Sequence, residues 1–188
     1  MISTFPKLCC FLALLSLAPT CWAQSFPSSY DGQIASSAAA YLYPYDWRYW
    51  KAQCYQESRL NPLAISPAGA MGLCQIMPRT WGEQSALMGV NASPFNPNAN
   101  ALVGAAYMRR MLRIWTAERP AYERLRLAWA SYNAGAGNII KAQKICGGRD
   151  WQNIAPCLHD VTGFNNSHET ITYVARIPVW YQGLVAQP

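Results

Sequence analysis

The chain has 188 residues, of which 15 are lysine or arginine and 9 are aspartate or glutamate, so its formal net charge is +6. This length suits one domain with a hydrophobic core. The modest basic balance suits a weakly acidic polymer or an anionic surface. It is only weak evidence for nucleic-acid binding, because no Lys/Arg run or recognition motif accompanies it, and no nucleic-acid partner is expected.

The first 23 residues are predicted to be a secretory signal peptide. Lys7 is the only charge before an apolar run over residues 8–18, and the small residues Cys21 and Ala23 occupy the positions that a signal peptidase reads. The apolar run is too short for a transmembrane helix. Acylation of Cys21 is the alternative, but the residues before it form a poor lipobox. We therefore predict a periplasmic or secreted protein, cleaved near Ala23, without a transmembrane segment.

Residues 24–44 are predicted to be a loose N-terminal lead-in, because the segment is rich in small and polar residues. The domain itself is predicted to occupy residues 45–188. Its first helix is expected to begin at Asp46, a natural N-cap, and to stop before Asn61-Pro62. A short helix is expected to follow, from Pro78 or Arg79 to about residue 86.

Three further helices are expected in the second half of the chain. They cover residues 101–115, with Asn98 or Asn100 as the N-cap, residues 121–134, which end at Gly135, and about residues 138–145. The last segment is expected to be helical at its start and interrupted by Pro178. The basic stretch at 108–113 is interpreted as the solvated face of a helix. With no convincing strand pattern, we predict a single, mainly α domain.

Four of the seven cysteines lie beyond the predicted signal peptide: Cys54, Cys74, Cys146 and Cys157. An even number in an exported chain suggests two disulfides. Three pairings are possible, and we favour the local pairs, which would make residues 146–157 a closed, insert-like loop. A zinc site is disfavoured because the chain has no C-x-x-C spacing and its two histidines do not accompany a cysteine pair. No metal or organic cofactor is expected.

Glu57 stands at an unusual position. Apolar residues recur at helical spacing through Trp50 and Cys54, and Glu57 is the next position on that face. A half-buried carboxyl has a raised pKa, as a general acid near neutral pH requires. The alternative is a glutamate that faces solvent or pairs with Arg59. A glycine-containing loop, residues 69–75, is expected to bring backbone groups and the Gln75 amide close to this helix.

A second carboxylate is the usual partner in glycoside hydrolysis. Asp46 lies about 16 Å before Glu57 at 1.5 Å per helical residue, and Glu83 lies beyond a turn. Glu169 is far along the chain and is interpreted as structural. One carboxylate can still cleave a sugar if the substrate supplies the nucleophile.

Four segments in order resemble the soluble lytic transglycosylase catalytic domain, glycoside hydrolase family 23. They are "ESRLNPLAISPAGAMGLCQIMP", "FNPNANALVGAAYMRRML", "AWASYNAGAGNI" and "ETITYVARI", and they span roughly residues 45–180. The resemblance implies a lysozyme-like fold with a substrate groove. It also implies cleavage of the β-1,4 bond between N-acetylmuramic acid (MurNAc) and N-acetylglucosamine (GlcNAc) in peptidoglycan glycan strands, with 1,6-anhydroMurNAc as the product and Glu57 as acid and then base.

The resemblance also implies roles for other residues. Ser58 would lie near the reacting sugar, Gln75 and the backbone at Leu73 would line a subsite, and Tyr132 and Asn133 would face the groove. Tyr173 would orient the Glu57 carboxyl. Each has a purely structural alternative: Tyr132 as a core aromatic, Asn133 as a helix cap and Tyr173 as a packed tyrosine.

One position departs from the family pattern, which usually has methionine where this chain has Cys74. A methionine would offer the sugar a flexible apolar surface. If Cys74 is bonded to Cys54, the loop is stiffened instead, and reduction is expected to loosen the loop and lower activity.

Two other functions are compatible with the same motifs. A lysozyme-like muramidase would need a held water and usually a second acid, and a non-catalytic wall-binding assembly protein would not need Glu57. By analogy with small members of the family, a secretion, conjugation or pilus machine is a candidate partner.

Overall fold

A computed structural model describes residues 25–187, so the predicted signal peptide lies outside the described residues. The described part is helical, with isolated bridges at residues 65, 71 and 76 but no strand. The mainly α prediction is confirmed. In chain order the elements are α1 (Asp31–Tyr41), α2 (Trp47–Ser58), α3 (Pro78–Met88), α4 (Pro97–Ile114), α5 (Ala121–Ala134), α6 (Ala136–Cys146), α7 (Trp151–Ile154), the 3-10 helix η1 (Ala155–Leu158), α8 (His159–Thr162) and α9 (Phe164–Val185).

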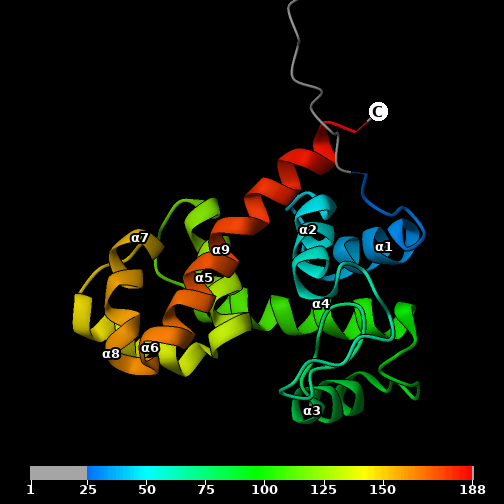
Figure 1. Ribbon diagram of the computed structural model, residues 1–188, viewed down its shortest axis with the longest axis horizontal. Coiled ribbons are helices and arrows are strands. Elements are labelled where there is room, and N and C mark those ends of the chain that lie inside the picture. Colours follow the sequence, from blue (N-terminus) through cyan, green and yellow to red (C-terminus); the bar gives the residue numbers. More distant parts are fainter. Residues whose placement is uncertain (1–24, 188) are drawn as a thin grey trace, which may run out of the picture.

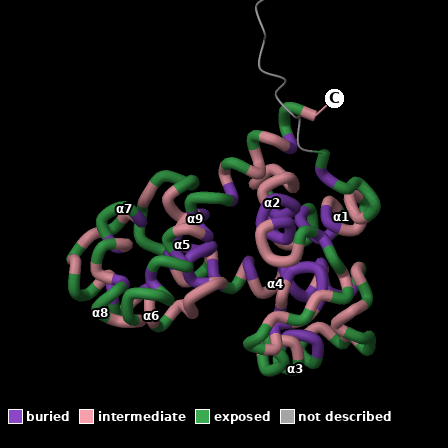
Figure 2. Tube along the Cα trace, in the orientation of Figure 1, coloured by how far each residue is buried: buried purple, intermediate pink, exposed green. Residues whose placement is uncertain are grey.

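The helices form two groups that share three central helices. In Figure 1, α1, α2 and α3 lie at one end and α6, α7 and α8 at the other, with α4, α5 and α9 connecting them. Helix α9 packs on α2 and α5, and α4 packs on α1 and α5. Buried positions follow the inner faces of these helices (Figure 2), with Trp50, Met108 and Trp129 fully buried. Within residues 25–187, no helix has both the length and the hydropathy needed to cross a membrane.

The prediction of a loose lead-in over residues 24–44 is wrong, because this segment contains α1. Ile34 and Ala38 of α1 are buried, and Asp31 pairs with the almost fully buried Lys51 of α2 at 2.5 Å. The small residues that suggested a loop in fact favour a helix. Alanine is the best helix former, and small side chains let α1 lie close to α4 and α2.

The helix boundaries follow local capping chemistry, with one correction. Asp46 caps α2 as predicted and accepts a hydrogen bond from the Arg48 amide at 2.9 Å. The N-cap of α4 is Asn96, which accepts from the Ala99 amide at 3.1 Å; the prediction of Asn98 or Asn100 is therefore wrong. Pro97 explains the shift, since proline is favoured in the first helical position directly after an N-cap.

Two segments are more helical than predicted. Helix α9 runs through Pro178 without ending there. The proline removes one helical hydrogen bond, but Ile177 and Leu184 are buried on its two sides, so packing on both halves holds the helix together. Residues 146–157 contain α7, because Trp151 and Ile154 turn into the core.

Both favoured disulfides are present. Cys54–Cys74 joins α2 to the loop that precedes α3, and Cys146–Cys157 joins the end of α6 to η1. Cys54 and Cys74 are fully buried. The first bond therefore fixes the loop against the helix that carries Glu57.

Candidate active site

Glu57 lines a pocket of about 470 Å³ at the C-terminal end of α2. It lies in the last turn of α2, and its side chain is partly exposed, unlike those of Trp50 and Cys54 on the same stripe. The pocket draws its walls from α2, the loop before α3, the end of α5 and α9. Its lining residues are Gln56, Glu57, Ser66, Ala68, Ala70, Gln75, Met77, Tyr132, Asn133, His168, Glu169, Thr172, Tyr173 and Arg176.

The environment of Glu57 raises its carboxyl pKa to about 8. Burial makes the largest contribution, and the nearby negative charge of Glu169 adds to it. Tyr173 acts in the opposite direction: its hydroxyl donates to Glu57 Oε1 at 2.5 Å, which favours the charged form. The raised pKa predicted from the helical stripe is confirmed. A carboxyl with this pKa carries its proton at neutral pH and can act as a general acid.

The end of α2 is tied to the following loop through Ser58. The Ser58 hydroxyl donates to the Leu73 carbonyl at 2.6 Å and accepts from the Asn61 amide at 3.1 Å. Arg59 and Leu60 then take positive φ angles of 58° and 62°, which turn the chain sharply away from the helix axis. Ser58 therefore places the loop beside Glu57.

Asn100 holds the other side of this loop. Its buried amide group donates to the carbonyls of Met71 and Pro94, and its Oδ1 accepts from the Cys74 amide at 2.8 Å. Gly72 has a φ of +77°, and a Cβ there would lie 2.4 Å from Asn100 Nδ2 and from the Pro94 carbonyl oxygen. Glycine is required at this position because the backbone passes directly over Asn100.

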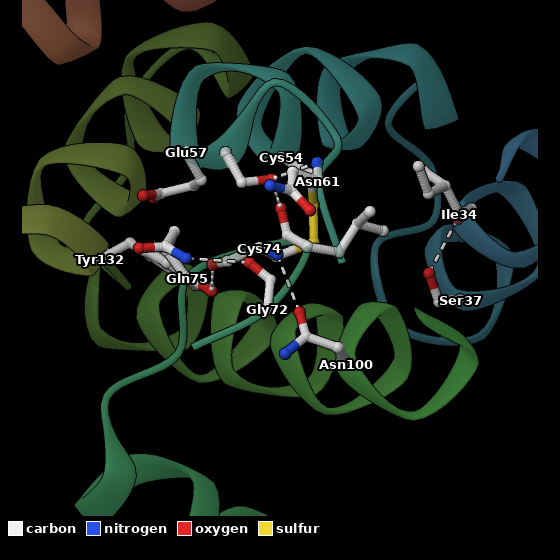
Figure 3. Close-up of a disulfide and its surroundings, with 12 residues drawn as sticks. Ile34, Ser37, Cys54, Glu57, Asn61, Gly72, Cys74, Gln75, Asn100 and Tyr132 are labelled. Atoms are coloured by element: carbon white, nitrogen blue, oxygen red, sulfur yellow. Dashed lines mark hydrogen bonds between the residues drawn. A yellow bond between two sulfur atoms is a disulfide. The ribbon is translucent and has the colours of Figure 1, made fainter. Parts of the chain in front are cut away.

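Gln75 and Tyr132 meet next to Glu57. Gln75 has a left-handed φ of 49°, and its Nε2 donates to the carbonyls of Ala64 and Gly72 at 3.1 and 3.0 Å. The Tyr132 hydroxyl donates to the Cys74 carbonyl at 2.9 Å. Figure 3 shows Glu57, Gln75 and Tyr132 on one side of the Cys54–Cys74 bond. The disulfide therefore lies behind the pocket wall.

A second carboxylate lies in the same pocket. Thr170 donates to Asn133 Oδ1 at 2.7 Å, and Asn133 Nδ2 donates weakly to Glu169 Oε1 at 3.5 Å. Glu169 lines the pocket and is exposed to solvent. The sequence interpretation placed Glu169 apart from Glu57, and this is corrected: α9 brings the two carboxyls together from positions 112 residues apart.

Residues 34–154 match the family model described as the transglycosylase SLT domain. The chain belongs to this family. Among curated proteins it is 32% identical over 160 residues to membrane-bound lytic murein transglycosylase F of Aliivibrio fischeri, covering 77% of this chain and 31% of the relative. Its identity to the protein of the same name in Idiomarina loihiensis is 34% over 154 residues, covering 74% of this chain and 33% of the relative. The chain thus spans about a third of these relatives' length.

Solved structures of SLT-family proteins share the fold. The 70 kDa soluble lytic transglycosylase of Escherichia coli matches with a TM-score of 0.65 and 24% identity, over 86% of this chain and 25% of that one. An inactive mutant of the lytic transglycosylase Slt from Pseudomonas aeruginosa matches with a TM-score of 0.67 and 25% identity, over 87% of this chain and 25% of that one. The lysozyme-like fold expected from the motifs is confirmed.

The SLT-domain fold gathers most of the residues singled out in the sequence. Glu57, Gln75, Tyr132, Asn133 and Tyr173 all line the pocket. Ser58 and Leu73 do not: the Ser58 hydroxyl is used to hold the Leu73 carbonyl, and the Leu73 side chain is fully buried.

Sequence reasoning missed several pocket residues on α9. Thr172 and Arg176 were not predicted, and Glu169 was interpreted as structural, yet all three line the pocket beside the predicted Tyr173. Counted from Glu169, the other three follow at helical intervals of three, four and seven. That periodicity in the fourth motif was the available signal. Across residues 25–187, no cluster of three or more His, Cys, Asp or Glu side chains is arranged to hold a metal ion.

Proposed function

We propose that the protein is a peptidoglycan lytic transglycosylase that cleaves the MurNAc–β-1,4–GlcNAc bond and forms 1,6-anhydroMurNAc. The observation that carries this proposal is the Glu57 carboxyl, whose pKa of about 8 keeps it protonated at neutral pH inside the pocket of an SLT domain. The names of the relatives, lytic murein transglycosylases, agree with this substrate.

The proposed reaction uses Glu57 twice. Its proton passes to the glycosidic oxygen as the bond from that oxygen to the muramoyl anomeric carbon breaks. The acetamido group of the same sugar stabilises the positive centre. Glu57, now a carboxylate, takes the proton of the muramoyl C6 hydroxyl, and the C6 oxygen bonds to the anomeric carbon. No water is consumed, and Glu57 ends in its protonated form.

Tyr173 is suited to the intermediate stage of this cycle. Its hydroxyl donates to Glu57 Oε1, so it stabilises the carboxylate that forms when the proton leaves. We propose that three further lining residues, Gln75, Tyr132 and Asn133, contact the glycan strand on either side of the bond. The tight bonds that fix the Gln75 loop favour a preformed binding surface.

A muramidase is the second candidate, and one observation favours it. Glu169 shares the pocket with Glu57 and is close enough for its charge to raise the Glu57 pKa. A solvent-exposed carboxylate opposite a general acid is the arrangement that activates a water in inverting glycosidases. The two candidates differ in whether the muramoyl product carries an added water.

Mass spectrometry of muropeptides released from purified peptidoglycan separates these functions. The protein and its Glu57→Gln variant are incubated with the same substrate. Anhydro-muramoyl products from the wild type alone are the expected result. Reducing-end products with an added water would establish a muramidase and point to Glu169, and no products from either protein would contradict both catalytic proposals.

We further propose that the protein acts in the periplasm or after secretion, where its substrate and two disulfides are compatible with an oxidising environment. Association with a secretion, conjugation or pilus machine stays a prediction.

A further inference from the structure

A second pocket lies near the N-terminal ends of α2 and α5, whereas the active-site pocket lies near their C-terminal ends. Its volume is about 720 Å³, larger than the 470 Å³ around Glu57. It is formed by the end of α1, the segment leading into α2, the last turns of α4 and the start of α5. We call it the arginine–tyrosine groove after six of its lining residues, Tyr41, Tyr43, Tyr45, Arg109, Arg113 and Arg124.

The groove is separate from the pocket at Glu57. No residue lines both. Trp47, at the start of α2, is ten residues and therefore about 15 Å from Glu57 at its end. On α5, Arg124 of the groove and Tyr132 of the active-site pocket are eight residues and about 12 Å apart. A ligand in the groove would leave the glycan site open.

The groove carries three positive charges that the protein itself does not neutralise. Within residues 25–187, Arg109, Arg113 and Arg124 make no ion pair, and no aspartate or glutamate lines the groove. Nearby carboxylates are occupied elsewhere: Asp46 pairs with Arg48 at 2.7 Å and Glu123 with Arg126 at 2.8 Å. The three guanidinium groups are therefore available to bind an external anion.

The three arginines lie around one groove, although they come from two helices. Arg109 and Arg113 are four residues apart on α4, a spacing that places like charges on one face at a small energetic cost. Leu112 lines the groove beside them, whereas Arg110 turns away toward Glu83. The Nε of Arg124 is buried without a hydrogen-bond partner in the part of the chain that the structure describes. Arg110 and Arg113 are exposed on α4, as the interpretation of residues 108–113 as a solvated helix face predicts. Arg109 and Arg113 also line the groove.

Aromatic side chains form the rest of the groove. Tyr43 is 86% exposed, an unusual exposure for a large ring, and it stands at the rim. Tyr45 is fixed by a hydrogen bond from its hydroxyl to the Ala121 carbonyl at 3.2 Å, and Trp115 is buried at the base. Arginine, tyrosine and tryptophan are the residues most enriched at energetically important positions of protein interfaces.

We propose that the arginine–tyrosine groove binds an acidic peptide segment of a protein partner, whose carboxylates meet Arg109, Arg113 and Arg124 while an apolar side chain lies against Tyr43. Charge complementarity identifies the occupant as an anion, and the aromatic rim favours one that also carries apolar side chains. The concave shape suits a peptide better than a bilayer surface. This inference does not depend on the proposed enzymatic activity.

The test is fluorescence anisotropy with a labelled peptide, Glu-Leu-Asp-Phe-Glu-Asp, and its amide analogue, Gln-Leu-Asn-Phe-Gln-Asn. The test variant combines Arg109→Gln, Arg113→Gln and Arg124→Gln. A matched control removes three exposed charges elsewhere, through Arg59→Gln, Lys141→Gln and Lys144→Gln. Thermal melting establishes that both variants are folded, and muropeptide release is measured separately.

The acidic peptide is expected to bind at least about tenfold more tightly than its amide analogue. The groove variant should lose about tenfold in affinity, equivalent to ~1.4 kcal/mol, and the control should stay within about twofold, as expected for screened distant charges. Tyr43→Ser should weaken binding about threefold without changing its salt dependence. Equal binding of both peptides, or equal losses in the groove and control variants, would overturn the proposal. So would arginine-dependent binding to vesicles of equal parts phosphatidylcholine and phosphatidylglycerol in the absence of peptide binding.

Discussion

The hydroxyl of Tyr173 should set the pH range over which Glu57 can act. Its hydrogen bond to Glu57 Oε1, at 2.5 Å, is the contact that lowers the pKa of this carboxyl against the effects of burial and Glu169. Hydrogen bonds to charged groups contribute about 1.5–3 kcal/mol. At 1.36 kcal/mol per unit, Tyr173→Phe should raise the pKa of Glu57 by about one to two units above its value of about 8.

The pH profile of kcat/KM for muropeptide release measures this shift. Because the first step of the proposed reaction requires protonated Glu57, kcat/KM of the wild type should fall as the pH rises through about 8. In Tyr173→Phe the fall should begin about one to two units higher. The plateau below it should be roughly 10- to 100-fold lower, since the forming carboxylate loses its donor.

A second tyrosine provides the matched control. Tyr122 lies on α5, is 41% exposed and does not line the active-site pocket, so Tyr122→Phe should leave both the plateau and the alkaline fall unchanged. If the fall in Tyr173→Phe occurs at the wild-type pH or below it, the hydroxyl does not stabilise the Glu57 carboxylate and the reasoning is refuted.

Three further predictions concern Glu57 and the disulfides. Glu57→Gln should release no product. Burial raises the Glu57 pKa from 4.5 to about 8, so ionisation of this carboxyl destabilises the folded wild type only above about pH 4.5. The melting temperature of the variant should therefore equal that of the wild type near pH 4 and exceed it at pH 8. Replacing both Cys54 and Cys74 by alanine removes a cross-link between residues that are 20 positions apart. The free energy of unfolding should fall by about 3 kcal/mol and activity should decrease. An unchanged melting temperature together with unchanged activity would contradict this prediction. The same change at Cys146 and Cys157, with a separation of 11, should have a similar effect on stability but leave the activity intact, because that bond lies outside the pocket.

The mainly helical fold and the position of Glu57 follow from local periodicity. The stripe through Trp50 and Cys54 ends at Glu57 because α2 ends there, and helical spacing is visible without any tertiary information. The first helix, α1, was not predicted, and the reason is physical. Its small residues have little hydrophobic periodicity of their own, and the segment is helical because α2 and α4 offer it a close-fitting surface.

The rest of the site depends on contacts between distant segments. Nothing in the sequence around Asn100 distinguishes a helix cap from a buried side chain that binds two backbone groups of the distant loop, at Met71 and Cys74, and the carbonyl of Pro94. The proximity of Glu169 to Glu57 likewise arises only when α9 packs along α2. The sequence contains both glutamates, but only the tertiary structure shows that the pocket holds two carboxylates and not one.

The Cys54–Cys74 bond also explains how this chain can depart from the family pattern at Cys74. The Cys74 side chain is fully buried and bonded, so it offers no apolar surface to a sugar. Met77, three residues later, is 44% exposed and lines the pocket. The flexible thioether that the family pattern places at position 74 is thus available from position 77, while the cysteine fixes the loop to α2. The disulfide and the exposed methionine are separate residues, and so reduction should disturb the position of the loop without removing the apolar surface that Met77 offers to the pocket.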